Sequence, residues 1–143
     1  MLMNISKKPW SNMIKLRISK LQLTLDKLSK KEPKTIEDAV ANLQTKSQRF
    51  HGVYVISDPK DKHILYVGRT IRGKGKLWQR LYNHLHRSDS LKTFGLRGKA
   101  GRKKIKKYFV RFIGIGNRTD KHTGRRNLEF FAISVISPKH NKG

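Results

Sequence analysis

The apolar residues of the N-terminal segment recur at steps of four and three, which is the spacing of one helix face. They are Ile14, Ile18, Leu21, Leu25 and Leu28. Pro33 ends this helix, and Thr35 is the expected N-cap of a second helix with acidic residues in its first turn. We expect residues 1–49 to form a helical extension that packs on the rest of the chain. A dimerisation stripe is the alternative, although two heptads are too short to argue for a coiled coil.

Beyond residue 50 the pattern changes to short runs rich in Val, Ile, Leu and Tyr. Residues 52–57 and 63–68 are two such runs separated by a polar turn, which predicts a β-hairpin. The length of the turn pairs Tyr54 with Tyr66 and Gly52 with Gly68. Both phenols are then expected on the same face of the hairpin.

The remaining elements follow from the same kind of pattern. Residues 76–87 predict a helix with three leucines on its buried face, residues 108–115 a third strand, and residues 127–137 an apolar closing helix. On the first of these helices Arg80 and His84 are four residues apart, so their side chains are neighbours.

The charge of the chain indicates a polyanionic partner. The 143 residues include 34 Lys and Arg against 9 Asp and Glu, a formal net charge of +25 that opposes compaction unless a polyanion neutralises it. DNA or RNA is the first candidate, because counterion release makes such binding strong. The absence of cysteine excludes disulfides and thiolate zinc sites. Neither a long apolar segment nor a secretory signal is visible, so we expect no membrane partner and a cytoplasmic location.

The most basic part of the chain is the segment 97–107, in which seven of eleven residues are Lys or Arg. We interpret it as a phosphate-tracking loop that orders on DNA, and the alternative is a solvated, disordered run. Its candidate DNA-binding residues are Arg97, Lys99, Arg102, Lys103 and Lys104.

Glu129 is the lone charged residue among the apolar residues 128–136. An unpaired carboxylate would be costly to bury there, so it either forms a salt bridge with an arginine or binds a cation. Carboxylate oxygen suits Mg²⁺, which keeps most of its waters and also accepts a phosphate oxygen as ligand. One carboxylate suffices for a one-metal phosphodiesterase site.

Four further residues carry candidate chemistry. A phenol such as Tyr54 or Tyr66 could orient or deprotonate a water if surrounding positive charge lowers its pKa. Arg80 could stabilise charge on a phosphate, and His84 could move a proton or hydrogen-bond a tyrosine. Each of the four also has an ordinary structural explanation, as strand aromatics, a basic surface residue and a solvated histidine.

Taken together, these residues resemble the GIY-YIG endonuclease family. Gly52-Val53-Tyr54 and Tyr66-Val67-Gly68 correspond to its two motifs, each with Val in place of Ile, and Arg69 continues the second motif as a further DNA-binding candidate. The resemblance covers roughly residues 50–143 and implies an α+β fold, with a three-stranded antiparallel sheet flanked by helices. It also implies cleavage of DNA with Mg²⁺, for which Mn²⁺ is expected to substitute.

The resemblance further assigns the catalytic positions. The family's arginine corresponds to Arg80, its metal-binding glutamate to Glu129 and its late asparagine to Asn141. The pair formed by Arg80 and His84 is similar to that of the family's restriction enzymes. In the implied mechanism Tyr54, with help from His84, activates a water, Tyr66 orients the phosphate and Asn141 supports the site.

The predicted function is therefore a type II restriction-type endonuclease that cuts double-stranded DNA at a short site, most simply as a homodimer on a palindrome. A homing or repair nuclease of the same family is one alternative. A noncatalytic basic nucleic-acid-binding module is another, but it explains neither Glu129 nor the two tyrosine motifs. A different metal nuclease would need several converging carboxylates, and few acidic residues follow residue 50.

Overall fold

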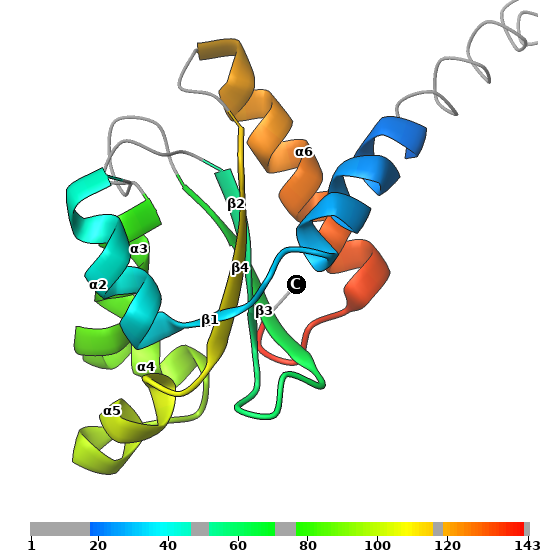
Figure 1. Ribbon diagram of the computed structural model, residues 1–143. Coiled ribbons are helices and arrows are strands. Elements are labelled where there is room, and N and C mark those ends of the chain that lie inside the picture. The colour runs from blue at the N-terminus through cyan, green and yellow to red at the C-terminus, as the bar shows by residue number, and fades with distance from the viewer. Residues whose placement is uncertain (1–17, 47–51, 71–76, 116–118, 142–143) are drawn as a thin grey trace, which may run out of the picture.

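A computed structural model of the chain describes residues 18–46, 52–70, 77–115 and 119–141. Within them a four-stranded antiparallel sheet lies between two layers of helices (Figure 1), so the predicted α+β class is confirmed. The strand order is β1-β4-β2-β3, with β1 Lys34–Thr35, β2 Gly52–Ser57, β3 Ile64–Arg69 and β4 Phe109–Gly114. Residues 1–17 of the predicted extension, Ile14 included, lie outside the described residues.

The helices divide between the two faces of the sheet. They are α2 Ile36–Lys46, α3 Leu77–His86, α4 Ser88–Thr93, α5 Gly98–Ile105 and α6 Thr119–Ile136, and residues 18–29 are also helical. Helices α2 to α5 cover one face, whereas α6 and residues 18–29 cover the other (Figure 1). Successive β2 residues therefore enter different cores: Tyr54 packs with α2 to α5, and Val53 packs with α6 and with Leu25 and Leu28.

The expected number of three strands is wrong because β1 is a fourth. Its Lys34 and Thr35 pair with Val110 and Phe109 of β4. Two residues are too few to leave a period-two pattern in the sequence.

The predicted N-cap is confirmed, since Thr35 Oγ1 accepts a hydrogen bond from the Asp38 N–H at 3.2 Å.

The register predicted for the hairpin is also wrong, by two residues. Tyr54 pairs with Gly68 and Tyr66 with Ile56, and the register shifts after Ile56. The turn contains Asp61 at φ 54°, an irregularity that loop length alone does not reveal. A register slip of two residues keeps each side chain on the same face of the sheet. The prediction that both phenols share a face is therefore confirmed, and their ring centroids lie 6.2 Å apart.

The segment predicted as a basic loop is in fact helix α5. Gly101 and Ile105 are buried on its inner side, where a Cβ at Gly101 would lie 3.1 Å from the backbone carbon of Leu96. Lys, Arg and Ala favour helices intrinsically. Two buried positions four residues apart are therefore enough to hold the segment as a helix against the core. By contrast, the helix predicted at residues 76–87 is confirmed as α3, and the closing helix begins earlier than expected, at Thr119.

Candidate functional site

Tyr54 lies on β2, which is paired on both sides by β3 and β4. Its side chain is fully buried and its ring lies across Gly68, where a Cβ would come within 2.4 Å of the phenol carbon Cζ. A side chain at position 68 would therefore displace the phenol. The glycine of the second motif and the tyrosine of the first form one packing unit, which explains why these residue types occur together.

The Tyr54 hydroxyl meets His84 of α3. The distance from Oη to His84 Nε2 is 2.9 Å, and the imidazole is only 5% exposed. The ring of Tyr66 lies 5.4 Å from that of His84, so the three rings form one cluster. Three predicted site residues from two strands and one helix thus meet at one point.

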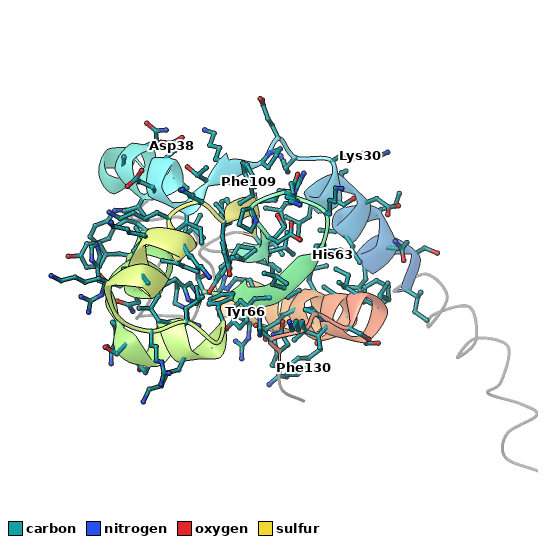
Figure 2. The ribbon with its side chains drawn as sticks, turned by 90° about the horizontal axis from the view of Figure 1, so that it is seen from below. Lys30, Asp38, His63, Tyr66, Phe109 and Phe130 are labelled. Carbon is teal, nitrogen blue, oxygen red and sulfur yellow. The ribbon has the colours of Figure 1, made fainter. Side chains whose placement is uncertain are left out.

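Arg80 and His84 open into a polar cleft of about 310 Å³. Its walls come from β3, α3 and α4, and its lining residues are Tyr66, Arg80, Asn83, His84, Arg87, Asp89, Ser90 and Thr93. Figure 2 shows Tyr66 between the two helical layers, whereas Phe130 of α6 lies at the surface. The cleft therefore exposes Tyr66, Arg80 and His84 to a water or a phosphate, whereas the fully buried Tyr54 does not line it.

Glu129 reaches the same region from α6. Its Oε1 accepts a hydrogen bond from Arg69 Nε at 2.9 Å, and the side chains of the pair are only 20% and 14% exposed for Arg69 and Glu129. Of the two predicted fates of this carboxylate, the salt bridge is therefore present. Arg69, expected to contact DNA, is held at the carboxylate at the end of β3.

Three buried polar atoms at this site have no hydrogen-bond partner within the described part of the chain. They are Arg69 Nη1, Arg80 Nε and His84 Nδ1, and no other buried side-chain nitrogen or oxygen of the described residues shares this property. Buried donors are almost always satisfied in folded proteins, so each of these atoms is free to bind a ligand, an ion or a water. Two of the three are arginine N–H donors, which suit an anion.

Burial sets the protonation of the cluster. It raises the pKa of Tyr54 well above the ordinary value, and the positive charge and hydrogen bond of Arg80, which lower this pKa, only partly oppose that effect. Burial, followed by the charge of Arg80, lowers the pKa of His84 to about 4. At neutral pH both groups are uncharged, and the Tyr54 O–H can donate to an unprotonated Nε2.

Burial also raises the pKa of Glu129, while Arg69 acts in the opposite direction. The described residues contain no group of three His, Cys, Asp or Glu side chains that could hold a metal. A Mg²⁺ site here would thus rest on one carboxylate, with water and phosphate oxygens as the other ligands, as is common for this ion. The mostly buried Glu129 carboxylate, near the unpaired N–H donors of Arg69 and Arg80, fits that arrangement.

Asn141 lies outside the cluster of Tyr54, Tyr66 and His84, and its side chain binds the backbone of β3 next to Tyr66. Its Oδ1 accepts from the Val67 N–H at 2.7 Å and its Nδ2 donates to the Val67 carbonyl at 2.8 Å. The His140 N–H donates to the Leu65 carbonyl at 2.8 Å. The C-terminal segment therefore lies along β3 on both sides of Tyr66.

The basic candidates occupy a different surface. Arg97 precedes α5, whose exposed side chains include Lys99, Arg102, Lys103 and Lys104. None of them lines the polar cleft. The structure therefore separates the predicted basic segment from the residues with candidate chemistry.

Two residues of the site region were missed by the sequence analysis. The ring of Phe94, directly after α4, lies 5.5 Å from those of Tyr66, His84 and His140. Arg125, fully buried on α6, donates to the carbonyl oxygens of Thr70 and Ile115 at 3.3 and 3.1 Å. Arg125 stands one turn before Glu129, a spacing that could have revealed it; Phe94 lies in a polar stretch with no such signal.

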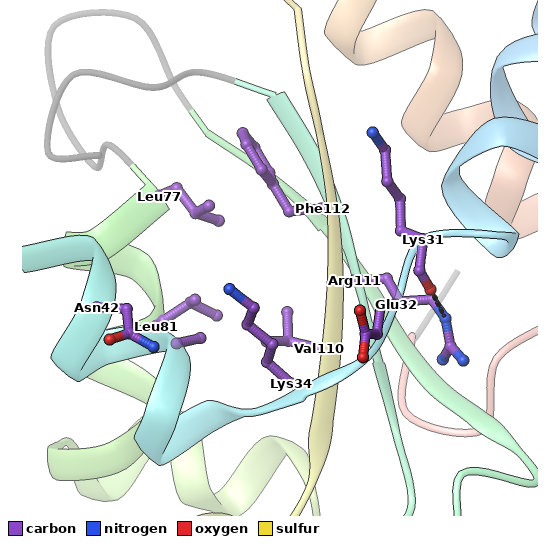
Figure 3. A pocket seen from close by; sticks show the side chains of 10 residues that line it. Lys31, Glu32, Lys34, Asn42, Leu77, Leu81, Val110, Arg111 and Phe112 are labelled. Atoms are coloured by element: carbon purple, nitrogen blue, oxygen red, sulfur yellow. Dashed lines mark hydrogen bonds between the residues drawn. The ribbon is translucent and has the colours of Figure 1, made fainter. Parts of the chain in front are cut away.

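A second pocket of about 320 Å³ lies on the same side of the sheet. Leu77 of α3 faces Phe112 of β4 across it, and Lys34 and Asn42 also line it (Figure 3). It contains none of the predicted catalytic residues, so the polar cleft is the candidate active site.

Comparisons with protein-family models, curated proteins and solved structures found no match to the chain. The assignment of this site therefore depends on its residues and their geometry. In the described part of the chain, no helix is both long and apolar enough to cross a membrane.

Proposed function

We propose that the chain is a Mg²⁺-dependent endonuclease of the GIY-YIG type that hydrolyses phosphodiester bonds in duplex DNA. The observation that carries the proposal is the group of unsatisfied buried atoms on Arg69, Arg80 and His84, beside the Tyr54 hydroxyl and the Glu129 carboxylate. A phosphodiester offers the anionic oxygens that these donors lack. The pair formed by Arg80 and His84 supports a restriction-type enzyme within this class.

The chain's own residues supply the proton path. A water hydrogen-bonded to the Tyr54 oxygen gives up its proton as its oxygen bonds to phosphorus, and the phenol passes its original proton to His84 Nε2. The bond between phosphorus and the 3′ oxygen breaks, the 3′ oxygen takes a proton from solvent, and His84 later returns its proton to solvent. Arg80 stabilises the charge on the phosphate. Mg²⁺ held by Glu129 would supply Lewis-acid stabilisation of that charge.

The test compares Glu129→Gln with Asp89→Asn, since both replace a carboxylate by an amide of similar size. Glu129 is the proposed ligand, whereas Asp89 lines the polar cleft and pairs with Arg87 at the surface. Incubation with methylation-free plasmid and Mg²⁺ should give fragments from the wild type and from Asp89→Asn. Glu129→Gln should cut roughly 100-fold more slowly or worse while still binding DNA.

Either of two results would contradict the proposal. Mg²⁺-dependent cutting by Glu129→Gln at the wild-type rate would remove the carboxylate from the mechanism. Binding of several unrelated DNAs by wild type without any cutting would favour a noncatalytic basic module, in which Arg69 and Glu129 form a purely structural pair.

A further inference from the structure

Helix α5 presents a compact cationic face to solvent. Lys99, Arg102 and Lys103 are exposed and stand at intervals of three and four residues, so they share one side of the helix. Gly101 and Ile105 occupy the opposite, buried side. None of the three cations forms an ion pair with an acidic residue of the described chain.

The helix is fixed to the candidate active site by a shared core. Ile105 belongs to the same buried cluster as Tyr54 and Phe94. The ring of Phe94 lies 5.5 Å from that of His84 and 5.8 Å from that of Tyr108, which follows α5. Because a close-packed core is rigid, the cationic face stays at a fixed distance from the cleft.

The size of α5 matches the major groove of B-form DNA. Its eight residues make a rod about 12 Å long and about 10–12 Å wide, which a groove about 12 Å wide admits. The helix lies at the edge of its layer, beyond α4, where no described element covers its outer side (Figure 1). The major groove of duplex RNA is too narrow for such an element.

We infer that α5 enters the major groove of duplex DNA beside the scissile phosphate and binds it through Lys99, Arg102 and Lys103. This inference rests on the proposed function, which places the phosphate in the cleft. The rigid connection through Phe94 then fixes the cut at a set distance from the segment that α5 contacts.

The experiment compares two variants that each lose three positive charges. One is Lys99→Gln, Arg102→Gln, Lys103→Gln on α5. The control is Lys20→Gln, Lys27→Gln, Lys30→Gln, which changes three exposed lysines in or next to the helix on the other face of the sheet. Fluorescence anisotropy with a short labelled duplex in EDTA measures binding without cleavage, so this test can fail or succeed independently of the nuclease assay.

The α5 variant should bind at least about tenfold more weakly near 0.1 M NaCl, and its salt slope should fall by roughly two to three. The affinity of the control variant should change far less. Methyl green, a major-groove ligand, should displace the wild-type protein from the duplex, whereas netropsin, a minor-groove ligand, should not. Equal losses in both variants, wild-type binding by the α5 variant, or equal competition by duplex RNA would each overturn the inference. The single variant Arg102→Gln gives the same readout with a smaller effect should the triple variant fold poorly.

Discussion

The phenol of Tyr54 is the most enclosed polar group of the candidate site. It is fully buried, its pKa is raised by that burial, and its hydroxyl contacts an imidazole whose pKa is lowered to about 4. A phenol in this state does not act as a free phenolate. In the proposed mechanism it instead relays a proton to neutral His84, so that the pair, and not either residue alone, acts as the base.

The depressed pKa of His84 predicts a pH dependence of stability. The ordinary value of 6.5 applies to the unfolded chain and about 4 to the folded chain, so the unfolded state binds more protons between these values. The contribution is present above about pH 6.5 and is lost as pH falls towards 4. Between about pH 8 and pH 5 the wild type should lose about 2 kcal/mol more than His84→Gln does.

Urea unfolding of both proteins at the two pH values measures this difference. An equal loss of unfolding free energy in wild type and His84→Gln would show that His84 takes up its proton normally in the folded protein. A larger loss in the variant would contradict the sign of the argument.

At this scale the sequence predicted which residues lie near one another better than it predicted how buried they are. Tyr54, Tyr66, Arg80, His84 and Glu129 all reach one region, because motif spacing on strands and helices is local information. Protonation was not predictable in the same way. Burial of Tyr54 depends on Gly68 and on the core of α2 to α5, which no single segment encodes.

Among the elements, length and periodicity decided what could be predicted. Helix α3 carries leucines at every fourth position and was predicted almost to its ends, whereas β1 has two residues and left no pattern. Helix α5 was missed because its charge resembles that of a disordered run. Only its contact with Leu96 and its place in the core around Phe94 reveal it as an ordered element.

The C-terminal segment acts as an extra edge for β3. Asn141→Ala removes both of its hydrogen bonds to Val67, so we expect a loss of about 1–3 kcal/mol in unfolding free energy. Hydrogen exchange at the Val67 amide should become faster, and DNA cleavage should fall more than DNA binding because Tyr66 is adjacent. Lys139→Ala, in the same segment but exposed, is the control. Unchanged protection of Val67 in Asn141→Ala would remove the positioning role.

Over the whole molecule, the sheet lies between two helical layers that both contribute residues to the candidate site. The layer of α2 to α5 carries the polar cleft and the cationic helix, whereas α6 brings Glu129 and Arg125 from the other face. Positive charge is not restricted to the proposed DNA surface, since exposed lysines also lie on the helix at residues 18–29. The charges that do not meet DNA still repel one another in the folded state.

This repulsion predicts that salt stabilises the fold. With a net charge of +25, raising NaCl from about 20 to 300 mM shortens the Debye length and should raise the unfolding free energy by roughly 1 kcal/mol or more. That change corresponds to an increase of about 3–5 °C in the melting temperature, measurable by circular dichroism. The variant Lys20→Gln, Lys27→Gln, Lys30→Gln should melt higher than wild type at low salt and respond less to added salt. A melting temperature that falls with salt would instead mean that native ion pairs, such as the bidentate contact of Arg111 with Asp61, outweigh the repulsion.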